Sequence, residues 1–377
     1  MADFPTFTFE GKKVILRTGF NGMNQADFAT LFVGLITDVS AENGNQDYAF
    51  TCTDIRQELK RVIYTVGDDG VTKIDSTHPR NLNGNPFDIL IAIFQNELGL
   101  DNSAFDLVGV QDLRDNVYSG IQFVATLTSS PVADEFITNE LMKPLGCYLW
   151  PNANGRICVK SFYPSINATP FLIAESSIIG IPLAEQAPLI NQVITRFDYS
   201  VDGGDPKAEV VSQYSKSTTL YGLYSDPHII ESKLMRSSFQ GFYLSGLTSY
   251  MIFLRYGMKS LMLGGNSIFT SLWTSAMLEP GDQVLVSHSI LPDRKNGIIG
   301  TTNQLMEVLD RTYHFRSATV DLRLLDLSSI AGLVFAEIAP TGEPAFRIAS
   351  SADKKTYMFM CADNDLYSDT TPGNLLG

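Results

Sequence analysis

The spacing of hydrophobic and polar positions changes several times along the chain, and each change predicts a different element. Up to residue 53, apolar and β-branched residues fall in short runs that end at turn residues, which favours strands over 12–20, 31–39 and 48–53. The last two runs flank Asn43-Gly44, a dipeptide that favours a two-residue hairpin turn. We expect this segment to form one sheet edge of a small barrel.

After Asp54 the apolar residues recur at the spacing of one helical face, which indicates helices. Asp54 can cap a helix over 54–64, because the apolar residues that follow it fall on one helical face. A clearer helix begins at Asn85-Pro86, since Asn is a favoured N-cap and Pro fits the first helical position, and Gly99 ends it. A third helix is predicted over 133–142. Together these helices make residues 54–162 an α/β insertion between β segments.

The strand pattern returns at a hairpin over 147–162, whose turn contains Asn154-Gly155, and continues at 190–199. The turn-rich segment 202–206 is interpreted as the join between two halves of the chain. Beyond it a helix is predicted over 239–256, and Pro280-Gly281 marks a turn. Apolar and charged residues alternate through 319–327, as in a half-buried strand. Other strands are expected at 259–273, 283–291, 303–309, 334–338, 345–348 and 357–361. The fold class is therefore β-rich α+β.

Composition narrows the class of protein. The chain has 377 residues, which suggests two to three structural units. Its net charge of −14 argues against DNA or RNA as a bound ligand, because phosphate binding depends on clustered Lys and Arg. Only 18% of the residues are charged, against roughly 25% in typical soluble domains. Because homo-oligomer interfaces are depleted in charge, this deficit suggests that other subunits cover much of the surface.

No motif carries a recognisable catalytic constellation, and we predict no catalytic, cofactor-binding or metal-binding residues. The four cysteines are interpreted as free and mostly buried thiols. Cys147 and Cys158 lie across the predicted hairpin and can face one another, but a metal site built on them needs ligands from distant segments. The acids lack the spacing of a calcium loop. The histidines are widely separated: His78, His228, His288 and His314.

Neither a targeting segment nor a membrane span is predicted. Residues 1–10 lack the basic and apolar regions of a signal peptide, so the chain is expected to stay in the cytoplasm where it is made unless something exports it. Two uncharged runs, 237–254 and 260–278, contain too many polar residues to span a bilayer and are interpreted as buried structure.

The order of these segments resembles the tail hub proteins of tailed bacteriophages and gene-transfer agents. The resemblance extends over nearly the whole chain to about residue 330, and each of its elements is short. The first barrel of the family is similar to the run from Phe32 through Asn43-Gly44 to Asp54. The further segments that resemble the family are Asn85 to Leu90, Leu145 to Trp150 with Asn154 to Ile157, Tyr221-Gly222, Leu278 to Val286 and Thr319 to Leu327.

This resemblance implies a fold of two tube-like β-barrels. The first would comprise residues 1–53 plus 163–202, and the second would comprise 203–330 with a helical excursion. The inserted α/β domain would be 54–162, and 331–377 would form a small C-terminal β module.

The resemblance also implies a structural virion protein, not an enzyme. It would be a homotrimeric hub that closes the distal end of the tail tube and adapts a threefold tip to a sixfold tube. Its partners would be the tail tube protein, a distal tail protein, the tape measure protein and a central fibre or spike. DNA would pass through its channel only as cargo, and no cofactor is implied. The chain would be assembled in the host cytoplasm and reside at the tail tip of the virion.

Two other functions fit the composition. One is a host-facing β-rich adhesin or carbohydrate-binding tail protein, although Trp150 and Trp273 are the only tryptophans among the 11% aromatic residues. The other is a glycan hydrolase that uses two of the 41 acids as an acid/base pair. A trimer alone does not separate the adhesin from the hub, whereas turnover abolished by one Asp or Glu substitution would establish the hydrolase.

Overall fold

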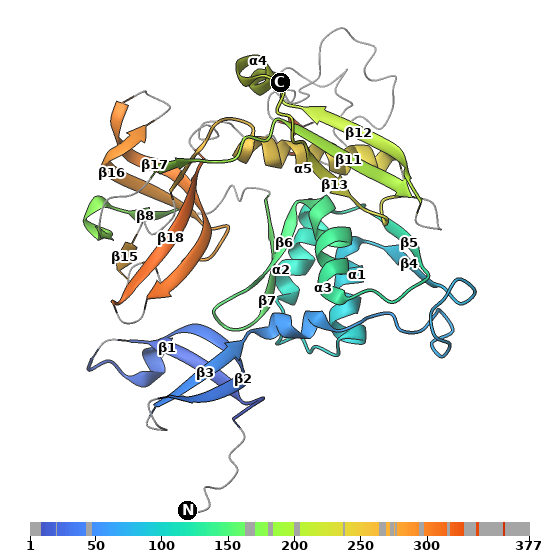
Figure 1. Ribbon diagram of the computed structural model, residues 1–377, viewed down its shortest axis with the longest axis horizontal. Helices are drawn as coiled ribbons and strands as arrows, with labels where there is room; N and C mark the ends of the chain where they lie inside the picture. Colours follow the sequence, from blue (N-terminus) through green and yellow to red (C-terminus); the bar gives the residue numbers. More distant parts are fainter. Residues whose placement is uncertain are drawn as a thin grey trace, which may run out of the picture. The chain divides into compact units, whose positions relative to one another are not determined.

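The computed structural model describes most of the chain (Figure 1). The described part is β-rich with a smaller helical portion, as predicted, and none of its sheets closes into a barrel. The expected turn at Asn43-Gly44 lies outside it. The described residues are 9–19, 21–42, 47–162, 170–179, 184–199, 204–236, 238–263, 269–271, 275, 277–293, 298–314, 317–327, 337–338 and 357–358.

The chain divides into two compact units. Unit 1 comprises Met1–Lys143 with Cys147–Lys160, and unit 2 comprises Pro144–Gly146 with Ser161–Gly377. The finer division into two barrels, an insertion and a tail stays a prediction.

Unit 1 begins with a three-stranded antiparallel sheet in the order β1-β2-β3. Its strands are β1 (Lys13–Thr18), β2 (Ala29–Glu42) and β3 (Asp47–Thr53), close to the predicted ranges, with the short 3-10 helix η1 (Gln25–Asp27) before β2. The register shifts between Leu16 and Arg17 and between Ile36 and Asp38, which bends the long strand β2.

The predicted helix over 54–64 is wrong in type and length. Asp54 caps as expected, and its carboxylate accepts the Arg56 N–H at 2.8 Å, but the helix is the 3-10 helix η2 (Ile55–Lys60). The chain then becomes extended because Val62 forms a bridge with Val132 and the Ile63 N–H donates to the Pro131 carbonyl at 3.0 Å. A distant segment therefore competes with the local helical preference of these residues.

The remaining helices of the insertion follow their sequence signals. The Asn85 side chain accepts the Phe87 N–H at 3.0 Å, and Gly99 follows the helix with a φ of +67°. Large side chains such as Phe87, Phe105 and Tyr118 form a solvent-excluded core. The elements are β4 (Arg80–Gly84), α1 (Pro86–Ala92), η3 (Ile93–Glu97), α2 (Leu107–Asp112), η4 (Leu113–Val117), β5 (Phe123–Leu127), α3 (Ala133–Glu135), η5 (Phe136–Met142), η6 (Lys143–Leu145), β6 (Cys147–Pro151) and β7 (Ile157–Ser161).

Unit 2 contains an eight-stranded sheet with the path β10-β14-β18-β17-β16-β8, to which β15 and β9 are attached. In β18 the side chains of Val320, Leu322 and Leu324 are buried and Arg323 is exposed, which confirms the predicted alternation. The strands are β8 (Phe171–Ile173), β9 (Ile178–Ile179), β10 (Ala184–Gln186), β14 (Leu261–Leu263), β15 (Phe269–Ser271), β16 (Gln283–Asp293), β17 (Ile298–His314) and β18 (Thr319–Asp326), and the 3-10 helix η7 (Glu175–Ser177) precedes β9.

A second sheet of unit 2 has the order β12-β11-β13, with β11 (Gln192–Tyr199), β12 (Pro206–Gln213) and β13 (His228–Glu231). The predicted helix over 239–256 is confirmed as α5 (Ser238–Tyr256), and its Ile252 and Phe253 pack with Val193 of β11. The short helix α4 (Ser215–Tyr221) precedes β13. Two further short strands, β19 (Glu337–Ile338) and β20 (Tyr357–Met358), pair in parallel.

The Pro280-Gly281 turn lies directly before β16. Gly281 has a φ of +89°, a conformation that favours glycine, and its N–H donates to the Val308 carbonyl at 2.7 Å. The Glu279 N–H donates to the Asp282 carboxylate at 2.8 Å. The turn therefore joins β16 to its neighbour β17.

Candidate assembly interface

One face of the β1-β2-β3 sheet is apolar at every described position except Thr18, at the end of β1. Directly paired residues share a face and alternate residues return to it, so the pairs Leu16–Phe32, Ile36–Cys52 and Val39–Phe50 belong to one face. We call this surface the apolar face. Its described residues are Val14, Leu16, Phe32, Gly34, Ile36, Val39, Tyr48, Phe50 and Cys52.

Several large residues of the apolar face are exposed to solvent. The exposed fractions are 39% for Leu16, 58% for Tyr48 and 46% for Phe50, and the exposed Phe9 ring packs edge-on against Phe50 at 5.5 Å between centroids. An antiparallel sheet normally buries the apolar face and leaves the polar face to water. An exposed apolar patch of this kind marks an interaction site.

The opposite face of this sheet is mixed in character and is contacted by the β6–β7 hairpin. It carries Lys13, Val33 and Asp38. In the hairpin turn, the Asn152 side chain accepts the N–H groups of Asn154 and Arg156, both at 3.0 Å. A side chain at Gly155 would place its Cβ 2.7 Å from that of Val33, so glycine permits this close approach.

We expect Gly155→Ala to lower the free energy of unfolding by about 2 kcal/mol. Gly155 has a φ of +75°, which costs an L-residue roughly 1–2 kcal/mol, and the added methyl group also collides with Val33. Denaturant unfolding of the full chain measures the change. Gly70→Ala is the control, because Gly70 has a similar φ of +69° and open space around it. Equal losses in the two variants would show that the contact with Val33 contributes nothing.

A second group of exposed apolar residues lies at the end of α4 and just after it, in unit 2. It consists of Leu220, Tyr221, Leu223 and Tyr224. The fully buried Asn191 holds this segment: its Nδ2 donates to the Gly222 carbonyl at 2.8 Å, and its Oδ1 accepts the Tyr224 N–H at 3.0 Å. The segment is therefore fixed in place while it exposes its apolar side chains, as expected for a binding surface.

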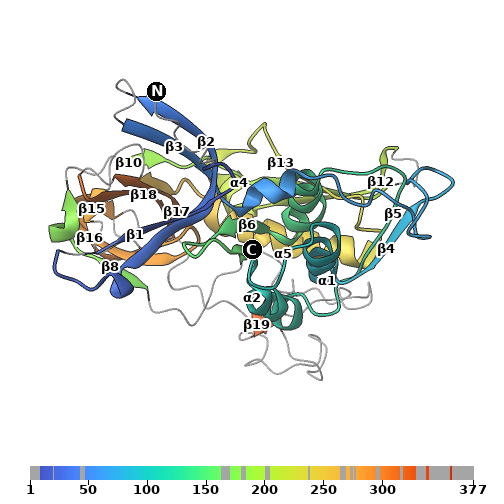
Figure 2. The same ribbon diagram turned by 90° about the horizontal axis from the view of Figure 1, so that it is seen from below.

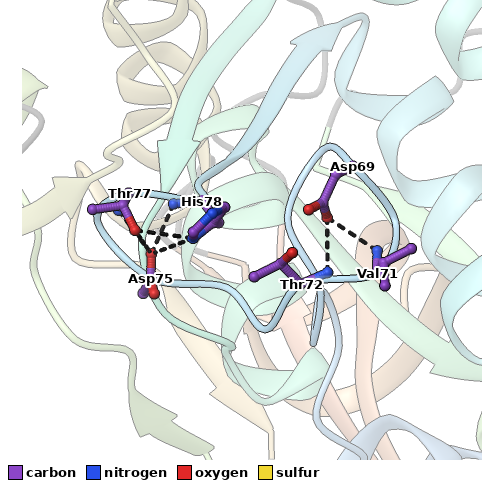
Figure 3. A network of polar contacts seen from close by, with 6 residues as sticks. All are labelled: Asp69, Val71, Thr72, Asp75, Thr77 and His78. Carbon is purple, nitrogen blue, oxygen red and sulfur yellow. Dashed lines mark hydrogen bonds and ion pairs between the residues drawn. The ribbon is translucent and has the colours of Figure 1, made fainter.

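Two exposed aspartates of unit 1 order the loop before β4 (Figure 3). The pKa of Asp69 is lowered to about 2 by hydrogen bonds from the Thr72 side chain and from the N–H groups of Val71 and Thr72. The pKa of Asp75 is also lowered to about 2, chiefly by the Thr77 hydroxyl and by the N–H groups of His78 and Thr77. Both carboxylates therefore act within their own loop, where they accept hydrogen bonds from nearby N–H and hydroxyl groups.

This loop is expected to lose its order on acidification. Because the folded pKa values of Asp69 and Asp75 lie below the ordinary 3.8, their stabilising effect is complete above that value and is lost as the pH falls through about 2. Amide exchange at Thr72 and Thr77, followed by NMR between about pH 5 and pH 2, measures the change. Asp69→Asn should abolish the response at Thr72 and leave that at Thr77. A response that Asp69→Asn leaves intact would contradict the assignment.

A cavity of about 230 Å³ with both polar and apolar lining residues lies beside β4. Arg80, Asn83, Asn96 and Glu97 contribute to its lining. The Glu97 carboxylate accepts the Tyr64 N–H at 2.8 Å, and burial raises the pKa of the Tyr64 hydroxyl. The Arg80 guanidinium lies 5.8 Å from the centre of the Tyr64 ring, and its buried Nε has no hydrogen-bond partner among the described residues.

The cysteines and histidines considered in the sequence do not gather into one site within the described chain. Cys147 and Cys158 are buried free thiols, and the Cys147 Sγ lies 3.5 Å from the Tyr118 hydroxyl. His288 Nε2 lies 4.0 Å from the Glu175 carboxylate, which also accepts hydrogen bonds from the N–H and hydroxyl of Ser289. No group of three or more His, Cys, Asp or Glu side chains in the described ranges is arranged to hold a metal ion. Nor does any described helix combine the length and apolar character needed to cross a membrane.

Neither the apolar face nor Asn191 was predicted from the sequence. Only residues 48–52 alternate between large and small side chains, whereas 14–16 and 32–36 are apolar at successive positions, so the strand pairing is needed to assign the face. Asn191 carries no sequence signal, because its partners lie 26 to 33 residues away.

Comparison with known proteins finds its matches among solved structures alone. No protein-family model and no curated protein matches the chain. A tail protein from Neisseria meningitidis MC58 is 9% identical with a TM-score of 0.46, and covers 80% of this chain and 81% of its own. Prophage tail protein gp18 from Listeria monocytogenes EGD-e is 10% identical with a TM-score of 0.43, and covers 86% and 89%. The 43 kDa tail protein of prophage MuSo2 from Shewanella oneidensis is 10% identical with a TM-score of 0.42, and covers 85% and 86%.

A chain in the virion of a gene transfer agent particle is more distant. It is 10% identical with a TM-score of 0.37, and the match covers 54% of this chain and 40% of that one. The structural neighbours named here are thus phage tail or virion proteins, at similarities below those that establish a common fold.

Proposed function

We propose that this chain is a structural component of a phage tail, namely a homotrimeric hub at the distal end of the tail tube. The observation that carries the proposal is the exposed apolar face of the β1-β2-β3 sheet, which suits a protein that works by assembling. The order of sequence segments and the low fraction of charged residues support the same function.

In this proposal each chain supplies two tube-like barrels that are completed only in the assembled ring. Three chains would then present six barrels and match a sixfold tube. The ring would contact the tail tube protein, a distal tail protein, the tape measure protein and a central fibre or spike. A net charge of −14 would let DNA pass through the channel without adhering, provided that acids line it.

Two measurements test the hub. Analytical ultracentrifugation of the full chain should give three times the chain mass of 41.5 kDa, and a stable monomer would count heavily against it. Negative-stain images of tails labelled with antibodies against this chain should show label at the tail tip. Label along the tail shaft or on the capsid would exclude a hub.

The cavity beside β4 favours a second candidate, a host-facing carbohydrate-binding tail protein. The amide side chains of Asn83 and Asn96 in its lining are groups that hydrogen-bond sugars. Binding of the full chain to host-surface glycans, weakened by Asn83→Ala and Asn96→Ala, would establish it. Binding that both variants leave unchanged would exclude this cavity as the glycan site.

A further inference from the structure

The cavity beside β4 lies in unit 1, where this strand and the helical segment that follows it both contribute to its lining. β4 contributes Arg80 and Asn83, and the segment α1–η3 contributes Asp88, Asn96 and Glu97. The volume of about 230 Å³ is below the roughly 300–1,000 Å³ of pockets for drug-sized ligands. The cavity therefore has room for one small ring and not for a long chain.

Two carboxylates of the lining each have one oxygen already in use. Asp88 Oδ1 accepts a hydrogen bond from Arg114 Nη1 at 2.8 Å, and Glu97 Oε2 accepts the Tyr64 N–H at 2.8 Å. Among the described residues, no hydrogen bond reaches the second oxygen of either carboxylate. Carboxylate oxygens accept hydrogen bonds and do not donate them. The lining therefore offers two acceptors to a ligand that brings its own donors.

Two amide side chains of the lining add donors. Asn83 Oδ1 accepts a hydrogen bond from Gln122 Nε2 at 2.6 Å, which leaves Asn83 Nδ2 to donate. The Asn96 side chain has no hydrogen-bond partner within the described ranges, so its amide can both donate and accept. Leu82 and Ile89 also line the cavity and supply apolar surface. This combination suits a ring with hydroxyl groups at its rim and C–H groups on its faces.

The charges at the cavity are predominantly negative. Arg80 is the one basic residue of the lining, and its Nη1 lies 3.9 Å from the Asp68 carboxylate. With their ion-pair partners, the charged lining residues comprise two arginines, Arg80 and Arg114, and four acids, Asp68, Asp88, Glu97 and Asp115. The excess of acids repels a ligand that carries a carboxylate, whereas a neutral ligand meets no such repulsion.

We propose that the cavity beside β4 binds one neutral sugar ring and discriminates against sugars that carry a carboxylate. Asp88 and Glu97 accept hydrogen bonds from the sugar hydroxyl groups, and Asn83 and Asn96 donate to them, because a hydroxyl group can both donate and accept. Hydrogen bonds to the ionised carboxylates are the stronger ones. The inference rests on the second candidate function, carbohydrate binding, and is independent of the hub.

Matched pairs of sugars test the discrimination. The methyl glycosides of glucose, galactose and mannose are each compared with the methyl glycoside of the corresponding uronic acid, which has a carboxylate in place of the CH₂OH group. Saturation-transfer NMR titrations with the full chain at low salt give the Kd of each sugar. The neutral member of at least one pair should bind about tenfold or more tightly than its acid, because the acid meets like charges. This ratio should fall at high salt, which screens exposed charges.

A charge-neutralising variant shows whether the two carboxylates cause the discrimination. Asp88→Asn/Glu97→Gln removes both charges but keeps an acceptor oxygen for the present partner of each carboxylate. It should reduce the ratio of the two Kd values to about twofold or less. The matched control is Asp134→Asn/Glu135→Gln, which removes two exposed acids of α3 that do not line the cavity and should leave the ratio unchanged. Circular dichroism of each variant shows that it remains folded.

The outcomes separate this inference from both candidate functions. Equal binding within every pair, or tighter binding of the uronic acids, would overturn the discrimination and leave carbohydrate binding standing. A preference for neutral sugars that survives Asp88→Asn/Glu97→Gln would overturn the role of these carboxylates. If none of the six sugars binds, the sugar site is wrong together with the second candidate function, and ultracentrifugation and the labelling of tails would still test the hub.

Discussion

Glu307→Gln is expected to lower the free energy of unfolding by about 3–5 kcal/mol, because it leaves the charge of Arg255 buried without a counterion. Arg255 of α5 and Glu307 of β17 are both nearly excluded from solvent, and Nη2 of the first lies 2.7 Å from Oε2 of the second. Arg255 Nε adds a second hydrogen bond at 3.1 Å to the same oxygen, and its guanidinium lies 5.1 Å from the centre of the Phe162 ring. The pair connects the long helix of unit 2 to its largest sheet.

Denaturant unfolding of the full chain measures this loss. Glu209→Gln is the matched control, since Glu209 pairs with Arg196 at 2.8 Å but both side chains are a third or more exposed. A surface pair of this kind contributes about 1 kcal/mol or less. The double variant Arg255→Met/Glu307→Leu should recover most of the loss, because it removes both buried charges together. If Glu307→Gln lowers the free energy of unfolding no more than Glu209→Gln does, the pair of Arg255 and Glu307 is not buried in solution.

Asn191→Leu is expected to lower the free energy of unfolding by about 2–4 kcal/mol, because it leaves the Gly222 carbonyl and the Tyr224 N–H without the Asn191 side chain as partner. The Asn191 side chain also donates to the Ser217 hydroxyl at 3.3 Å. Leucine has a similar volume, so the loss comes from unpaired polar groups and not from a cavity. The exposed segment from Leu220 to Tyr224 should become more mobile, which hydrogen exchange at Tyr224 measures.

The control for Asn191 is Asn102→Leu. Asn102 is exposed and accepts one hydrogen bond from the Gln95 side chain at 2.8 Å. Its replacement should change the free energy of unfolding by less than about 0.5 kcal/mol. Protection at Tyr224 that survives Asn191→Leu would contradict the proposed restraint, whatever the change in stability.

Local elements were predictable where neighbouring residues determine them. Asn85-Pro86 starts a helix because the cap, the first-turn proline and the apolar face act within a few residues. The alternation in β18 is equally local. The prediction of a helix over 54–64 was wrong because Val62 and Ile63 pair with residues 131 and 132. A local sequence pattern does not show this competing interaction.

The sheet to which each strand belongs could not be predicted from local sequence patterns. Residues 171–173, 178–179 and 184–186 are strands in the structure, but their partners lie about 80 to 115 residues further along the chain. Several alternative pairings satisfy the same alternation, and long-range packing selects among them. For the same reason, local sequence patterns do not reveal the buried pair of Arg255 and Glu307, which are 52 residues apart.

By itself, the sequence determined the β-rich class, the capped helices and the low charge, because composition and short-range periodicity specify them. The tertiary structure alone decided that several large apolar side chains on one face of β1-β2-β3 are exposed, that no other described strand pairs with its edges, and that Asn191 and Glu307 are buried. Exposure depends on which distant segments cover a residue. Long-range packing therefore decides whether the apolar side chains of a strand are covered or form a candidate assembly surface.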